Sequence, residues 1–244
     1  MKLHAIICQV LSRECFQAAA LSPHMVSVST QLSGLHREPD KLRQTLQEEI
    51  DKASGCGNDY ILLAYGLCSR GTADLTARDT PIVIPKVHDC ISLLLGSNAR
   101  YQREFGEHPG TYYFSSGWIE YMDGELDQGM FTGKKEREYE ERLREYTEKY
   151  GEDNAVYLLE QESQWLVNYS RAALIDLPLG DSEHYRWFTK DIAESRNWVY
   201  EELHGDLRLF EKLFNGDWDS SEFLIVQPGQ RTLECVNSDI ISAG

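Results

Sequence analysis

The sequence predicts an α/β protein with mostly parallel β-sheets, arranged as two Rossmann-like lobes. Short apolar runs alternate with segments of helical spacing near the N-terminus, and the same alternation returns after residue 170. A β-α-β-α-β order is typical of a parallel sheet with helices on both faces. We assign residues 1–125 to an N-terminal α/β lobe that carries the cysteines of interest, and residues 126–244 to a helical insertion followed by a C-terminal α/β lobe.

The first lobe begins with a buried strand and a helix. Residues 40–53 then place leucine or isoleucine at every fourth position, which is typical of a helix with one buried face, and we expect Asp40 to cap its start. Prolines 81 and 85 suggest that the strand around them is irregular or lies at the sheet edge. The predicted strands are residues 2–10, 25–32, 60–67 and 81–87, and the predicted helices are residues 12–22 and 40–53.

The rest of the chain is less regular. A helix, a tight turn at residues 108–110 and a short strand at 111–114 lead into a highly charged stretch, 134–162, which we interpret as a solvated helix face. The loop 227–230 follows a strand and is expected to reach the same sheet edge as the cysteines. The later predicted strands are residues 171–177, 198–203 and 222–230, and the later predicted helices are residues 181–196 and 206–216.

Charge excludes several classes of partner. The chain has 40 acidic and 24 basic residues, for a net charge of −16. Nucleic acids and anionic membrane surfaces both select a basic face, so we expect no nucleic-acid partner and no membrane partner. No apolar stretch is long enough to span a bilayer, and the N-terminus lacks a signal-peptide cleavage pattern. We therefore expect a cytoplasmic protein whose cysteines are reduced, metal-bound or catalytic.

Three of the six cysteines lie where predicted strands end. Cys8 lies near the end of the first predicted strand, Cys68 follows the strand at 60–67, and Cys90 follows the strand at 81–87. The carboxyl ends of parallel strands share one edge of the sheet, and the binding crevice of such folds lies along that edge. These three thiols are therefore expected to converge there. Buried packing is the simpler interpretation of the remaining cysteines, Cys15, Cys56 and Cys235.

Two kinds of metal site suit three thiolates. Zinc takes four ligands, so Cys8, Cys68 and Cys90 could complete a tetrahedron with His88, which lies two residues before Cys90. Alternatively, the three cysteines could bind a [4Fe-4S] cluster and leave one iron free for a substrate. The spacing contains no Cys-x-x-Cys pair, so it does not decide between these metals.

Other residues near the strand ends are candidates for catalysis and cofactor binding. His36, His88 and Glu14 could transfer protons, although a helix-capping or structural role is also open to each. In the segment around Cys68, glycines permit close approach of the backbone, and a tyrosine could line the crevice. The cofactor-binding candidates are Tyr65, Gly66 and Gly71. The sequence has no nucleophile elbow, P-loop or dinucleotide-binding glycine motif.

Seven segments of the chain resemble the "domain of unknown function 1638" family. They are residues 8–14, 34–43, 59–71, 84–97, 108–120, 150–158 and 220–231. The resemblance covers nearly the whole chain, and it departs from the usual family member at Gln9 and Gln227, where the family has Glu and Pro.

The resemblance implies a shared site but no defined reaction. The family pattern keeps the cysteines that match Cys8, Cys68 and Cys90, and the histidine that matches His36, whereas a histidine matching His88 occurs in the branch most similar to this chain. The family is common in anaerobes and methanogens, often alongside corrinoid-dependent methyltransferase systems. This association implies a corrinoid protein or a methyltransferase as a partner.

Three functional hypotheses follow. The first is an enzyme whose [4Fe-4S] cluster acts through its open iron, as a Lewis acid or in sulfur chemistry, on a small-molecule substrate. The second is a zinc site that activates a thiolate for methyl transfer. The third is an accessory protein that binds a corrinoid or a partner through the middle aromatics, Tyr112, Tyr113, Phe114 and Trp118.

Overall fold

The structure is a computed structural model that describes residues 1–121, 135–152, 154–156, 158–159, 168–235 and 240–244. The chain divides into two compact units, which are described separately. Unit 1 comprises Met1–Glu104, Leu177–Gly180 and His204–Gly244, and unit 2 comprises Phe105–Asp176 and Asp181–Leu203. Both units combine helices with a sheet that contains parallel strand pairs, which confirms the predicted α/β class.

Unit 1 is built on a five-stranded sheet with the order β2-β1-β3-β4-β8. The first four of these strands run parallel, and β8 runs antiparallel to β4. The apolar runs found in the sequence form the central strands, whose side chains are almost entirely buried. The strands are β1 (Lys2–Cys8), β2 (Met25–Gln31), β3 (Tyr60–Ala64), β4 (Ile82–Pro85) and β8 (Phe223–Val226).

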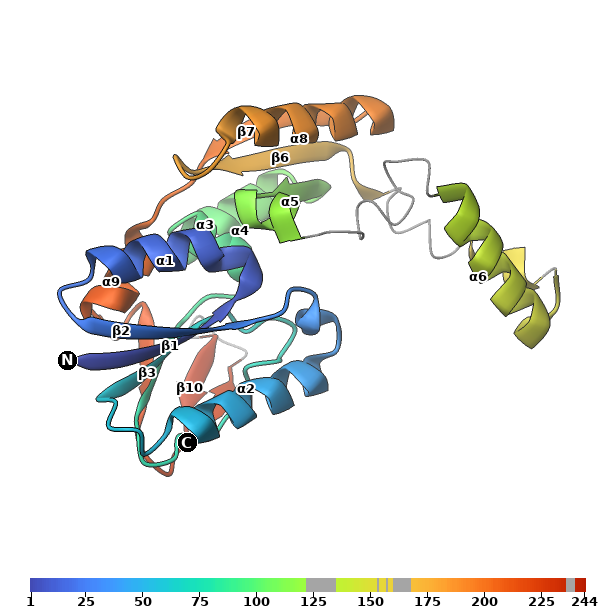
Figure 1. Ribbon diagram of the computed structural model, residues 1–244. Helices are drawn as coiled ribbons and strands as arrows, with labels where there is room; N and C mark the ends of the chain where they lie inside the picture. The colour runs from blue at the N-terminus through green and yellow to red at the C-terminus, as the bar shows by residue number, and fades with distance from the viewer. Residues whose placement is uncertain (122–134, 153, 157, 160–167, 236–239) are drawn as a thin grey trace. The chain divides into compact units, whose positions relative to one another are not determined.

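Helices cover both faces of this sheet (Figure 1). Helices α1 (Ser12–Leu21) and α9 (Arg208–Asn215) pack together on one face, and α2 (Pro39–Ala53) packs on the other. The predicted stripe of α2 is buried: Leu42, Leu46 and Ile50 are at most 1% exposed and lie in the core against β1, β3 and β4. Burial of such a stripe stabilises the helix more than its own propensity does.

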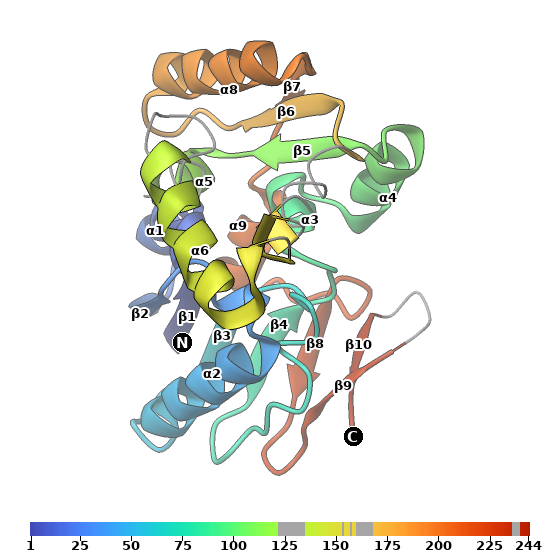
Figure 2. The same ribbon diagram turned by 90° about the vertical axis from the view of Figure 1, so that its right-hand side faces the viewer.

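Shorter elements complete unit 1. Two 3-10 turns, η1 (Gln9–Leu11) and η2 (Leu35–Arg37), flank α1 and α2, and the short helix α3 (Cys90–Leu94) follows β4. Helix α4 (Asn98–Glu107) begins in unit 1, and its last residues belong to unit 2. The antiparallel pair β9 (Thr232–Glu234) and β10 (Ile241–Ala243) lies beside β8 (Figure 2).

Unit 2 contains a three-stranded sheet with the order β5-β6-β7. Helix α8 packs on β6, and the core between them includes Phe114, with Tyr112 and Trp118 packed against it. Three of the four aromatics considered for a docking surface therefore contribute to this core. The elements are β5 (Thr111–Phe114), α5 (Ser116–Tyr121), α6 (Lys135–Tyr150), β6 (Arg171–Asp176), α8 (Ser182–Arg196) and β7 (Val199–His204).

Part of the charged stretch 134–162 lies outside the described residues. Helix α6 accounts for Lys135–Tyr150. Within the described part of the chain, no helix has the length and apolar character needed to cross a bilayer.

Three expectations about single elements are wrong. The edge position suggested for the strand with prolines 81 and 85 is wrong: β4 lies between β3 and β8, and its prolines lie at or beyond its ends, where they interrupt little of the backbone ladder. Strand β8, expected in a C-terminal lobe, pairs with β4 in the N-terminal sheet. Asp40 does not cap α2, because the helix begins one residue earlier, at Pro39, with Glu38 in the cap position.

Candidate thiol site

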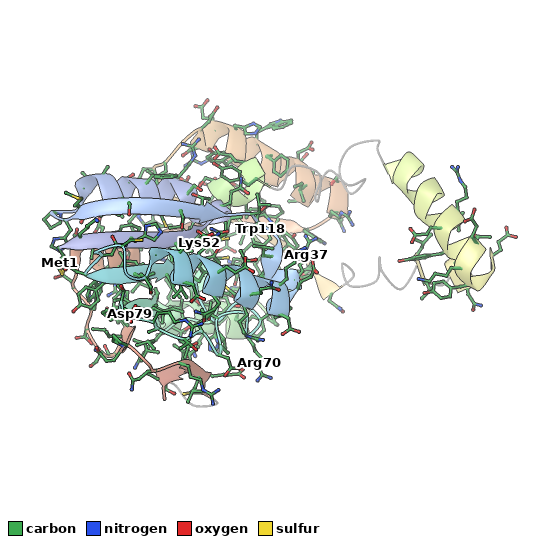
Figure 3. All side chains as sticks on the ribbon, turned by 60° about the horizontal axis from the view of Figure 1, so that its bottom comes forward. Met1, Arg37, Lys52, Arg70, Asp79 and Trp118 are labelled. Carbon is green, nitrogen blue, oxygen red and sulfur yellow. The ribbon has the colours of Figure 1, made fainter. Side chains whose placement is uncertain are left out.

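The three predicted cysteines are placed by three neighbouring strands of unit 1. Cys8 is the last residue of β1, Cys68 lies in the loop after β3, and Cys90 begins α3 after β4. Strands β1, β3 and β4 are adjacent and parallel, so these positions share the carboxyl edge of the sheet. Figure 3 shows Arg37 and Arg70 at this end of the unit, opposite to Met1. The charge of Cys8 acts on both Cys68 and Cys90, and the charge of Cys68 acts on Cys90, so the three thiols lie near one another.

Backbone hydrogen bonds hold the Cys68 and Cys90 segments together beyond the ends of their strands. The Leu67 N–H donates to the Val87 carbonyl at 2.9 Å, and the Cys68 N–H donates to the His88 carbonyl at 2.9 Å. Gly66 permits this approach, since a Cβ there would lie 2.6 Å from the Asp89 backbone nitrogen. The group that approaches the Gly66 backbone closely is therefore another segment of the same chain, residues 88–89.

The loop that carries Cys68 has an unusual backbone. Cys68, Ser69 and Arg70 all have left-handed φ values, of 47°, 56° and 72°. Consecutive non-glycine residues rarely adopt this conformation, and such strain concentrates at functional sites. The turn is held by a hydrogen bond from the Gly71 N–H to the Cys68 carbonyl at 3.0 Å, and by the Arg43 guanidinium, which donates to the Arg70 carbonyl at 3.2 Å.

Gly71 has a packing role in this loop. A Cβ at this position would lie 2.4 Å from the Leu42 Cδ2 of α2. The glycine therefore lets the loop lie directly against the helix, and it holds Cys68 close to the core that α2 forms with the sheet.

The three thiols are only partly exposed, and desolvation favours their neutral form in the absence of a ligand. Desolvation is the main cause that raises the pKa of Cys8, and the Val10 backbone N–H and the Tyr65 hydroxyl partly oppose it. Desolvation also raises the pKa values of Cys68 and Cys90, and the negative charges of Asp89 and the neighbouring thiols add to this effect. The thiols therefore ionise only when something else, such as a metal, stabilises the thiolate.

Tyr65 lies directly beside Cys8. Its side chain is 3% exposed, and its hydroxyl makes no hydrogen bond of standard geometry within the described residues. Desolvation, the charges of Cys8, Cys68 and Cys15, and the interaction of the hydroxyl with the Cys8 thiol all raise the pKa of Tyr65, so the phenol stays protonated and remains a donor. Buried polar atoms without a partner are uncommon in folded proteins, and they often mark a ligand or catalytic site.

The predicted acid-base residues lie in different environments. His36, in η2, is partly buried, and desolvation and Arg37 lower its pKa while Asp89 raises it. Glu14, in the first turn of α1, is fully buried and adjacent to Cys15. His88 is exposed and lies in the segment between the end of β4 and the start of α3, outside the strand.

Two residues that the sequence did not single out belong to this region. Asp89 caps α3, accepting a hydrogen bond from the Ser92 N–H at 3.1 Å, and its charge acts on His36, Cys68 and Cys90. Cys15 is fully buried and interacts electrostatically with Cys8. Aspartate is a preferred N-cap residue, and its position directly before a helical apolar run could have identified Asp89.

Other candidates lie away from the thiols. Cys56 is exposed and donates to the Lys52 carbonyl, and Cys235 donates to the Ser242 hydroxyl. The loop 227–230 was expected at the cysteine edge, and this is wrong: β8 is antiparallel, so its carboxyl end lies at the opposite edge. There, Pro228 and Gly229 line a hollow of about 560 Å³ together with Asp51 and Arg78.

The donor set of the site suits a thiophilic metal. Three thiols are the ligands that zinc and iron-sulfur clusters select, and the Tyr65 hydroxyl supplies a donor for the negative charge of a bound group. Within the described residues, however, no three His, Cys, Asp or Glu side chains are arranged around a single point where one metal ion could bind. The thiols are therefore neighbours without forming a compact mononuclear site.

One family matches this chain. The sequence pattern described as "Protein of unknown function (DUF1638)" matches residues 31–214, a range that contains His36, Tyr65, Cys68 and Cys90 but not Cys8. Comparisons with curated proteins and with solved structures gave no match. Because the matched range covers most of its length, the chain belongs to the family of proteins of unknown function DUF1638.

Proposed function

We propose that the protein is an enzyme that binds a [4Fe-4S] cluster through Cys8, Cys68 and Cys90, in a crevice at the carboxyl ends of the strands, and acts on a small molecule. The observation that carries this proposal is the placement of three neighbouring thiols at the carboxyl ends of three adjacent parallel strands, with Cys8 acting electrostatically on the other two. In open α/β sheets this edge is where ligands bind. A cluster held by three cysteines would leave one iron open for Lewis-acid or sulfur chemistry.

The arrangement of the described residues argues against a single zinc ion and leaves the cluster as the favoured group. A zinc site needs its sulfurs about 2.3 Å from one point, and no such group exists within the described residues. In a cubane cluster each thiolate binds a different iron, so the sulfurs stand further apart. Thiols that lie near one another but are not arranged around a single metal ion are compatible with a cubane cluster.

The chain supplies proton-transfer groups around this site. Desolvation lowers the pKa of His36, which keeps its ring neutral near pH 7 and able to accept a proton from a substrate. Glu14 is buried next to Cys15 and would carry protons on the α1 side of Cys8. His88 is exposed and would exchange protons with solvent.

Anaerobic purification with metal analysis tests the proposal. We expect about four irons per chain with broad visible absorbance, and loss of both in Cys8→Ser, Cys68→Ser and Cys90→Ser variants. Cys56→Ser is the matched control, because that thiol is exposed and lies in a turn away from the strand ends; it should keep its iron.

Two results would contradict the cluster. A colourless, iron-free protein after anaerobic reconstitution with iron and sulfide would exclude it. One zinc per chain without visible absorbance would instead favour thiolate activation for methyl transfer, with a corrinoid protein or a methyltransferase as the partner.

A further inference from the structure

Tyr65 combines two features that rarely occur together. Its side chain is 3% exposed, yet its hydroxyl has no hydrogen bond of standard geometry among the described residues. The protein interior normally satisfies buried hydroxyls, so an exception calls for an explanation, such as a ligand bound at that place. Tyr185 of unit 2 shows the usual arrangement: it is equally buried, and its hydroxyl donates to the Glu120 carboxylate.

Strand register brings the Tyr65 side chain to Cys8. Ile7 of β1 pairs with Ala64 of β3, so Cys8 and Tyr65 are the next residues along the two neighbouring parallel strands. Side chains alternate between the faces of a sheet, and both residues lie on the face that packs against α2. The phenol and the thiol therefore project side by side at the carboxyl edge.

A neutral thiol is a poor acceptor, whereas a metal-bound thiolate is a good one. This difference explains why the Tyr65 hydroxyl, although it lies beside the Cys8 thiol, makes no hydrogen bond of standard geometry when the site carries no ligand. Binding of a metal at Cys8 would therefore supply the acceptor that the Tyr65 hydroxyl lacks.

We propose that Tyr65 is a positioning residue whose hydroxyl donates a hydrogen bond to the Cys8 sulfur once that sulfur ligates a metal. This inference rests on the proposed metal site and specifies how the chain stabilises it. Hydrogen bonds to ligand sulfurs raise the reduction potential of iron-sulfur clusters, and loss of such outer contacts commonly weakens metal binding by about 10–100-fold.

The Tyr65→Phe variant tests the proposal in two states of the protein. In the reduced, metal-free protein we expect an unchanged or higher melting temperature, because the variant removes a buried hydroxyl that has no partner. In the reconstituted protein we expect a more negative reduction potential, and about 10–100-fold faster loss of iron to a chelator. Tyr185→Phe is the matched control: it should lower the melting temperature and leave the potential unchanged.

The possible results separate this inference from the proposed function. A lower melting temperature of metal-free Tyr65→Phe would show that the hydroxyl already has a structural partner, and would overturn the inference. An unchanged potential and unchanged iron loss would overturn it while leaving the cluster in place. If wild-type protein forms no cluster but binds Cd²⁺ more tightly than Tyr65→Phe does, the inference stands and the cluster fails. If the wild-type protein binds neither an iron-sulfur cluster nor Cd²⁺, both this inference and the proposed function are overturned.

Discussion

Cys68, Ser69 and Arg70 share a backbone conformation that L-amino acids avoid. A left-handed residue other than glycine costs about 1–2 kcal/mol, and here three follow one another. The loop is kept in this form by contacts on both sides: Arg43 of α2 donates to two of its carbonyls, and Arg70 forms an ion pair with Glu234 at 2.7 Å. Strain that neighbouring contacts maintain is typical of functional sites, and it fixes where the Cys68 thiol lies.

Ser69→Gly measures this strain. Relief of the left-handed conformation should gain about 1–2 kcal/mol, and the added freedom of glycine in the unfolded chain should cost about 0.5–1 kcal/mol. We therefore expect a net increase of about 0.5–1 kcal/mol in the free energy of unfolding, measured by urea denaturation. Ser69→Ala keeps the Cβ and should leave stability unchanged; an equal gain in Ser69→Ala would show that the backbone is not the cause.

At the scale of the elements, the site depends on the contact between the segments that follow β3 and β4. Gly66 lies at this contact, and a Cβ there would meet three backbone atoms at 2.6, 2.7 and 2.9 Å. Backbone atoms cannot rotate away as the end of a side chain can. The two segments must therefore separate if the glycine is replaced.

We expect Gly66→Ala to lower the free energy of unfolding by about 1–3 kcal/mol, the usual cost of overpacking, and to reduce iron content after reconstitution. Gly106→Ala is the control, because nothing lies within 4 Å of a Cβ in that helical position, and it should stabilise α4 by about 0.5–1 kcal/mol. Thermal unfolding and iron analysis of both variants provide the measurement. Normal stability of Gly66→Ala would show that the two segments are not in tight contact.

Local sequence patterns predicted most helices and strands of unit 1. They could not predict, for every strand, which strand it pairs with in the sheet, or in which direction. The stripe of Leu42, Leu46 and Ile50 encodes α2 directly, because one helix face must be buried. The direction of β8 depends on its partner β4, more than 130 residues earlier in the chain, and nothing in its own apolar run specifies that partner. The same limit applies to the loop 227–230, which was placed at the wrong edge.

The candidate site likewise contains features that the sequence predicts and features that depend on contacts between distant segments. The parallel-sheet rule was sufficient to bring Cys8, Cys68 and Cys90 to one edge. The capping role of Asp89 is visible in the local sequence, but its charge effect on His36 and Cys68 and the environment of the Tyr65 hydroxyl emerge only from contacts between segments distant in sequence. These contacts depend on strand register, which a single sequence does not reveal.

At the scale of the whole molecule, the buried thiols link stability to pH. Desolvation is the main cause that raises the pKa values of Cys8, Cys15, Cys68 and Cys90 above the value of 9.0 for an unperturbed thiol. Above about pH 9 the unfolded chain therefore loses protons that the folded protein retains. The folded state binds more protons, so the free energy of unfolding of the metal-free protein must fall as pH rises.

Each buried thiol adds up to about 1.4 kcal/mol per pH unit to this alkaline slope. Urea denaturation of the reduced, metal-free protein at several values between about pH 8 and pH 10.5 should show the full decline, with a shallower slope in Cys68→Ser. Cys56→Ser, which removes an exposed thiol, should keep the wild-type slope. A metal would remove this dependence, because ligation already releases the protons that the folded thiols otherwise hold, so the reconstituted protein should lose this alkaline sensitivity. Equal slopes with and without metal would mean that the thiols do not ligate it.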